Sequence, residues 1–136
     1  VVPSAKDNTT LTVFLQLNGS YSNPGDVFQA VVKVKNTGER MAVRAYTYLE
    51  NIPQDWSMLS PDSSRVFQLG NIPQGETVTK TIIVRRGQTD ATIYSVACAR
   101  NASCVSSDLI PVPISLLVSL ALLGSFAGLY YWRRRA

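Results

Sequence analysis

Residues 28–38 read FQAVVKVKNTG and carry the clearest structural signal in the chain. Phe28, Ala30, Val32 and Val34 alternate with residues that are mostly polar, which is the period of a β-strand with one buried face. The Asn36-Thr37-Gly38 triplet that follows favours a turn. The segment therefore predicts a strand that ends in a sharp reversal.

The same alternation recurs on both sides of this segment. Six further strands are expected, over residues 11–17, 41–49, 66–69, 78–84, 92–99 and 104–108. In the strand over 41–49 we expect Met41 and Val43 to face inward and Arg44 to face outward. Seven short strands with one buried face each must pack as two layers. The expected fold is an all-β immunoglobulin-like sandwich of about seven strands.

Cys98 and Cys104 are the two cysteines of the chain. In an exported domain, an even number of cysteines normally forms disulfides. The residues between them can form a tight reversal that brings the two Cα atoms within bonding distance. We therefore expect a disulfide between neighbouring strands at the membrane-proximal end of the domain, with two free buried thiols as the alternative.

The segment from Ile110 to Trp132 contains no charged side chain. A helix of this length would measure about 34 Å, slightly more than the ~30 Å hydrocarbon core of a bilayer. Three aromatic rings end the segment and three arginines follow, as is typical of the cytoplasmic side of a membrane helix. These six residues are Tyr130, Tyr131, Trp132, Arg133, Arg134 and Arg135. The sequence predicts a transmembrane helix over 110–132 and a basic cytoplasmic tail over 133–136.

Residues 1–109 would then form an extracytoplasmic domain on a single-pass protein of the plasma or inner membrane. An outside N-terminus needs an export signal, and residues 1–6 show none, so we expect Val1 to follow a removed signal peptide. The net charge of +4 reflects the topology, because the three terminal arginines account for most of it. No basic cluster interleaved with aromatics occurs in the outer part, which argues against a nucleic-acid partner.

Ala121, Gly124 and Gly128 place small side chains on one face of the predicted helix. Such a face lets a second membrane helix approach closely. The alternative is that glycine and alanine are simply common in membrane helices. The predicted partners of this segment are the lipid bilayer and other membrane-protein subunits.

The composition argues against catalysis. The chain contains no histidine, which removes the commonest acid–base group and transition-metal ligand. No motif pairs a Ser or Cys nucleophile with a lysine or carboxylate base. Asp55, Asp62 and Asp90 lie in loops, where a solvated turn carboxylate is the usual case. We expect no enzymatic activity, no cofactor and no metal.

Phe14, Tyr46 and Tyr48 lie on predicted outward faces of strands. They are either ordinary residues of a pleated surface or a docking face for a protein or for sugar rings. Both interpretations stay open at this point.

Three Asn-x-Ser/Thr triplets begin at Asn8, Asn18 and Asn101. All lie on the predicted outer side, where N-glycosylation takes place. Such triplets also arise by chance in chains rich in serine and threonine, so they permit modification without requiring it.

Three segments of the chain resemble the CARDB-type and NPCBM-associated β-sandwich modules of exported bacterial and archaeal proteins. They are VKVKNTG at 32–38, IPQDW at 52–56 and LGNIPQGET at 69–77. The resemblance covers about residues 10–98 and implies a sandwich with Trp56 inserted into the core and Gly75 at a turn. It also implies a role as spacer, adhesion unit or accessory domain.

The tail from Ile110 to Arg135 is similar to bacterial sorting signals of the PEP-CTERM and IPTL-CTERM kind, although residues 112–116 depart from both patterns.

Together, the features predict a non-catalytic, single-pass accessory subunit of a larger membrane complex, whose outer sandwich braces or docks partners. The alternative is a membrane-tethered adhesin or carbohydrate-binding module that binds glycans.

Overall fold

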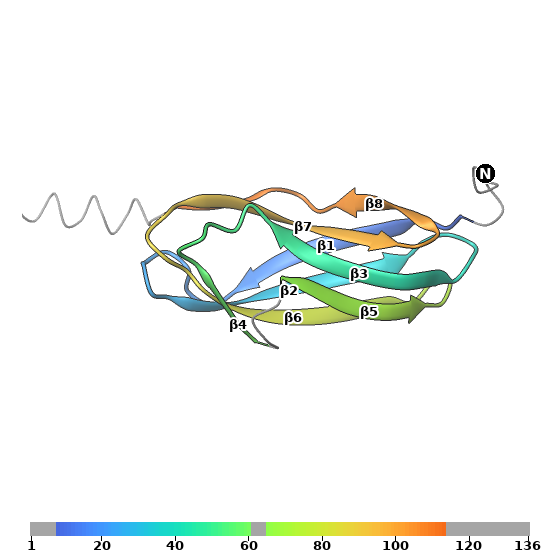
Figure 1. Ribbon diagram of the computed structural model, residues 1–136, viewed down its shortest axis with the longest axis horizontal. Coiled ribbons are helices and arrows are strands. Elements are labelled where there is room, and N and C mark those ends of the chain that lie inside the picture. The colour runs from blue at the N-terminus through green and yellow to red at the C-terminus, as the bar shows by residue number, and fades with distance from the viewer. Residues whose placement is uncertain (1–7, 61–64, 114–136) are drawn as a thin grey trace, which may run out of the picture.

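The computed structural model describes residues 8–60 and 65–113 of the 136-residue chain. These residues form an all-β domain whose strands run roughly along its long axis (Figure 1). The strands are β1 (Leu11–Asn18), β2 (Val27–Asn36), β3 (Ala42–Glu50), β4 (Ser57–Ser60), β5 (Val66–Ile72), β6 (Thr77–Arg85), β7 (Ala91–Ala99), β8 (Ala102–Ser106) and β9 (Ile110–Val112).

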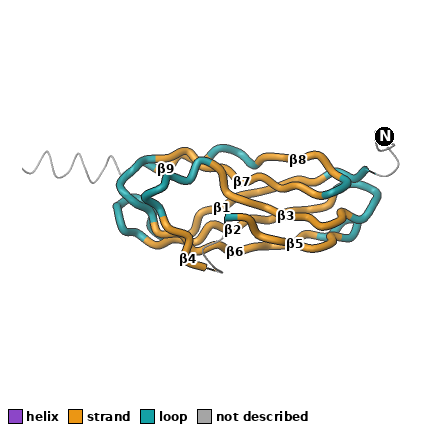
Figure 2. Tube along the Cα trace, in the orientation of Figure 1, coloured by secondary structure: helices purple, strands orange, loops and turns teal. Residues whose placement is uncertain are grey.

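Two antiparallel sheets make up the domain. The four-stranded sheet has the order β1-β2-β6-β4, and the five-stranded sheet has the order β5-β3-β7-β8, with β9 paired to β7. Figure 2 shows that β9 lies at one end of the molecule, which we call the exit end, and that the β7–β8 turn lies at the other, the far end. The expectation of an all-β fold with two packed sheets is confirmed.

The core lies between the sheets, and alternate residues along the strands point into it. Phe28, Ala30, Val32 and Val34 of β2 are all buried, as the sequence predicts. Trp56 is also buried, and its ring meets the ring of Phe28 edge to face at 6.1 Å. Burying a side chain of this size contributes roughly 1.5–3 kcal/mol. The core therefore joins the loop before β4 to the start of β2.

The turn after β2 depends on a buried asparagine at the far end. Asn36 donates from Nδ2 to the carbonyl oxygens of Ile72 at 2.8 Å and Arg40 at 2.6 Å. Its Oδ1 accepts bonds from the Thr9 hydroxyl at 2.6 Å and from the Gly38 N–H at 3.0 Å. A Cβ atom at Gly38 would collide with Thr9, so only glycine fits there.

The start of β3 departs from the predicted alternation. Met41 precedes the strand and is exposed, while Ala42 is buried. The β3–β5 register shifts between Ala42 and Ala45, and Arg44 has a φ of 50° within this bulge. An extra residue in a bulge changes which side chains face inward. The prediction that Met41 faces the core is therefore wrong, whereas the alternation from Ala45 onward is confirmed.

Two strands were not predicted. Residues 57–60 form β4, which pairs with β6 through Met58 opposite Val84. Residues 110–112, predicted as the first turn of a transmembrane helix, instead pair with β7, with Ile93 opposite Ile110 and Ala91 opposite Val112. The expected helix start and the domain boundary at residue 109 are therefore wrong, because the sandwich continues through Val112.

The rest of the predicted helix, residues 114–132, and the tail 133–136 lie outside the described residues. The small residues Ala121, Gly124 and Gly128 and the aromatic and arginine residues 130–135 belong to that part. Within 8–60 and 65–113, no helix is long and apolar enough to cross a membrane.

Cys98 and Cys104 form the predicted disulfide, with an S–S distance of 2.02 Å, and it joins β7 to β8. Its position differs from the expectation. The chain leaves the sandwich beside Ala91, at the start of β7, whereas Cys98 lies near the end of that strand. The disulfide therefore lies toward the far end of the domain.

Candidate functional site

Three tyrosines share the outer face of the five-stranded sheet. In the β3–β7 register Tyr46 lies opposite Cys98, Tyr48 opposite Val96 and Glu50 opposite Tyr94. Side chains alternate across a strand, so these residues lie on the side away from the core. We call Tyr46, Tyr48 and Tyr94, together with Glu50, the tyrosine face. The sequence singled out the first two tyrosines and missed Tyr94.

The rings of Tyr46 and Tyr48 pack against each other on this face. They are stacked with centroids 6.3 Å apart and planes 18° from parallel. Val96 and Cys98 lie opposite these tyrosines and are buried, although they point away from the core. Directly opposed side chains on adjacent strands are close enough to cover one another. The tyrosines therefore cover an apolar floor and remain half-exposed themselves.

The surroundings of Tyr48 favour its protonated form. Burial raises the pKa of Tyr48 above its usual value of 10.0, and the Glu50 carboxylate and the neighbouring phenols of Tyr46 and Tyr94 raise it further. The Tyr48 hydroxyl therefore keeps its proton well above neutral pH. The surface combines apolar rings with hydroxyl donors, a combination that is common where proteins dock.

Phe14 belongs to a different surface. It is 60% exposed on β1 and lies opposite Lys33 in the four-stranded sheet. The tyrosine face is on the other sheet, so the predicted docking set of Phe14, Tyr46 and Tyr48 is not one surface. The structure brings together the two tyrosines and separates the phenylalanine from them.

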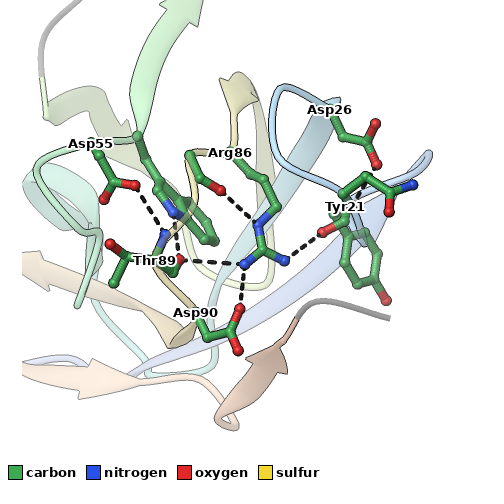
Figure 3. Close-up of polar contacts among 9 residues, drawn as sticks. Tyr21, Asp26, Asp55, Arg86, Thr89 and Asp90 are labelled. Carbon is green, nitrogen blue, oxygen red and sulfur yellow. Dashed lines mark hydrogen bonds and ion pairs between the residues drawn. The ribbon is translucent and has the colours of Figure 1, made fainter. Parts of the chain in front are cut away.

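A buried cation joins the loops of the exit end. Arg86 is 1% exposed, and Figure 3 shows its guanidinium at the centre of several polar contacts. Nη2 pairs with Asp90 Oδ1 at 2.6 Å, Nη1 donates to the Tyr21 carbonyl at 3.1 Å, and Nε donates to the Gly87 carbonyl at 3.1 Å. The guanidinium carbon also lies 5.4 Å from the centre of the Trp56 ring. Each contact is to the protein itself, which makes the cluster a structural clamp.

The predicted loop carboxylates belong to the same clamp. Asp55 Oδ2 accepts the main-chain N–H of Thr89 at 2.9 Å, and this bond is the main cause that lowers the pKa of Asp55. Trp56 Nε1 donates to the Thr89 carbonyl at 2.9 Å. Asp90 is held by Arg86, and Asp62 lies outside the described residues. In the parts that the structure describes, no group of three acidic, Cys or His side chains could hold a metal ion.

The three predicted glycosylation sites differ in their surroundings. Asn8 and Asn18 are exposed, the second at the end of β1. The Asn101 side chain is used within the fold, because its Oδ1 accepts the Val43 N–H at 2.9 Å and its Nδ2 donates to the Met41 carbonyl at 2.8 Å. Its amide therefore ties the β7–β8 turn to the start of β3.

Comparison with known proteins gives no family. No protein-family model and no curated protein sequence matches the chain. The resemblance to CARDB-type and NPCBM-associated modules therefore stays a prediction.

Several solved structures are similar to this chain at low identity and low TM-score. AvmM, which catalyses macrocyclisation in alchivemycin A biosynthesis, is 11% identical with a TM-score of 0.44, over 80% of this chain and 90% of its own. The β-glucosidase EmGH1 of Erythrobacter marinus is 16% identical with a TM-score of 0.40, over 76% of this chain and 15% of its own. A Bordetella pertussis protein assigned as ApaA is 16% identical with a TM-score of 0.39, over 77% and 89%. These values are too low to carry an argument about function.

Proposed function

We propose that this chain is a non-catalytic accessory subunit whose sandwich docks a protein partner through the tyrosine face. The observation that carries the proposal is the stacked, half-exposed pair of Tyr46 and Tyr48 beside the buried Val96, with Tyr94 on the same face. Tyrosine is enriched at interfaces because it offers a large apolar surface and a hydrogen-bonding hydroxyl.

We also propose that the sandwich is of the immunoglobulin-like type. Its sheet order β1-β2-β6-β4 corresponds to strands A, B, E and D of that fold, and β3-β7-β8 corresponds to C, F and G. The chain departs from this pattern at β5, which comes after β4 in the sequence and pairs with β3 at the edge of the five-stranded sheet. The strand order supports the architecture and implies no activity.

The membrane anchor is part of the same proposal. Residues 114–132 are uncharged and mostly apolar, and three arginines follow. This pattern supports a single-pass helix with a cytoplasmic C-terminus and an outer sandwich. The sandwich ends at Val112, so an anchor that begins a few residues later would hold the exit end close to the bilayer. Partner subunits would contact the chain both within and outside the membrane.

The test is extraction of the full chain in mild detergent, followed by native sizing. The expected result is that the wild-type chain migrates in a complex, while a larger share of the Tyr46→Ala, Tyr48→Ala double variant migrates at the 14.9 kDa of one chain plus its micelle. Phe14→Ala is the matched control, because it removes an exposed aromatic ring from the other sheet and should leave the complex intact. Migration of the wild-type chain alone would overturn the proposal.

A glycan ligand is the second candidate function. Half-exposed tyrosine rings such as those of Tyr46 and Tyr48 can also stack on a sugar ring. A glycan array probed with the full chain distinguishes the two functions. Binding that the tyrosine double variant loses and Phe14→Ala keeps would favour an adhesin or carbohydrate-binding module.

A further inference from the structure

Two arginines continue the tyrosine face toward the far end of the domain. Tyr46 lies opposite Cys98, and the next contact along these strands is the Arg100 N–H, which donates to the Val43 carbonyl at 2.8 Å. Arg44 follows Val43 directly. Arg44 and Arg100 are therefore neighbours across β3 and the end of β7, and both side chains are exposed.

This arrangement is unfavourable for the folded chain by itself. Like charges on adjacent strands repel each other. Arg44 also has a φ of 50°, in the left-handed region that a side chain disfavours. Within 8–60 and 65–113, neither arginine belongs to an ion pair. The backbones of the two arginines are thus held side by side, and neither side chain pairs with a carboxylate of the described residues.

The surrounding structure fixes both positions. The side chain of Asn71 accepts the Arg44 N–H at 2.9 Å. Asn101 ties the turn that contains Arg100 to the start of β3, and the disulfide joins the strands on either side of that turn. Strained residues that are held this firmly occur most often at functional sites.

The opposite end of the tyrosine face carries a negative charge. Glu50 lies opposite Tyr94, six residues along β3 from Arg44, a distance of about 20 Å in an extended strand. The outer face thus has a cationic end, an aromatic middle and an anionic end. A uniformly anionic polymer laid along it would meet repulsion at Glu50.

We propose that this face binds an extended segment of a protein partner, with carboxylates over Arg44 and Arg100 and a lysine or arginine over Glu50. The inference rests on the proposed docking function and defines the chemistry of the partner. Guanidinium groups bind carboxylates through two parallel hydrogen bonds, which explains a pair of arginines at this position. The apolar side chains of the segment would lie on Tyr46 and Tyr48.

The probe is a synthetic extended peptide of about seven residues with two glutamates at one end, alternating Thr and Val, and a lysine at the other end. A second peptide has glutamine in place of both glutamates. Fluorescence anisotropy with the full chain in detergent measures both affinities. The expected result is that the acidic peptide binds more tightly, and that Arg44→Ala with Arg100→Ala weakens its binding about tenfold.

The matched control is Lys33→Ala with Lys35→Ala, which removes the same charge from exposed positions on the other sheet. It should leave binding unchanged. Arg44→Gly serves as a second variant, because glycine tolerates the positive φ, so a loss of peptide binding with it cannot be attributed to unfolding.

Equal binding of the two peptides, or equal weakening by the lysine and arginine variants, would overturn the inference. Binding of a polyuronate chain through Arg44 and Arg100 without peptide binding would overturn it in favour of an anionic glycan. If the tyrosine double variant still releases the partner on native sizing while the arginines have no effect, the docking function stands and only this inference fails.

Discussion

Arg86 buries a full positive charge at the exit end and offsets its desolvation with local partners. Three main-chain carbonyls, the Asp90 carboxylate and the Trp56 ring surround the guanidinium. Burial of a charge is tolerated only when such groups satisfy it. Because Tyr21, Trp56 and Thr89 come from three different loops, this one side chain fixes how these loops lie against each other.

Replacing Arg86 with alanine should therefore destabilise the domain. The change leaves buried carbonyl oxygens without donors and opens a cavity, which together cost about 3 kcal/mol. Urea unfolding of the full chain, followed by tryptophan fluorescence, measures the loss. Arg85→Ala is the control, because Arg85 is exposed and its removal should change the free energy of unfolding by less than ~0.5 kcal/mol. Equal losses for the two variants would contradict the clamp.

Asp55 should make the domain less stable in acid. The Thr89 N–H stabilises the ionised carboxylate and lowers the pKa of Asp55 below 3.8, its ordinary value. A lowered pKa means that this contribution is fully present above the unfolded value and is lost as the pH falls through the folded value. Wild type should exceed Asp55→Asn in stability at pH 6, and the difference should shrink between pH 4 and pH 2. Urea midpoints at each pH provide the measurement, and a difference that does not change with pH would rule out this role.

The strands show which features the sequence could predict. The segment at 28–36 was predicted correctly because its apolar residues keep a strict period of two and a turn follows. The start of β3 was predicted wrongly, because the bulge there depends on the left-handed backbone of Arg44, which Asn71 of another strand holds in place. No boundary between β9 and the following residues is visible in the sequence at Ile110, since β9 and the apolar run after it have similar composition.

The candidate site was only partly predictable for a related reason. Alternation within a strand indicates which residues point outward, but it does not indicate which strands are neighbours. Tyr94 joins Tyr46 and Tyr48 because of the β3–β7 register, and Phe14 is separated from them because β1 is in the other sheet. Both facts depend on long-range pairing, which a single sequence does not reveal.

The β7–β8 pair should depend on its disulfide. Cys98 and Cys104 are six residues apart, so the bond closes a short loop and contributes about 2 kcal/mol on the chain-entropy estimate. The Cys98→Ala, Cys104→Ala double variant should lose about this amount in urea unfolding. Reduction of the wild-type protein should give a similar loss and should leave the double variant unchanged. An effect of reductant on the double variant would point to another cause.

In the whole molecule, the two ends of the sandwich carry opposite charge. The loops of the exit end contain Asp26 and Asp55, and Asp90 pairs with Arg86 there. The far end carries more exposed cations than carboxylates, with Lys35, Arg40, Arg44 and Arg100 against Glu39 and Glu76. Charge of one sign at one end steers and orients partners as they approach. A partner with an acidic surface would therefore approach the far end first.

The pairing of β9 with β7 also determines how a mechanical load would enter the domain. β9 runs antiparallel to β7 and points toward the exit end, so tension on the following residues would act along the strand rather than across it. The residue pairs Ile93–Ile110 and Ala91–Val112 would then be sheared apart together instead of separating one after the other. Force applied through a tether after β9 would therefore be transmitted directly to β7, a central strand of the five-stranded sheet.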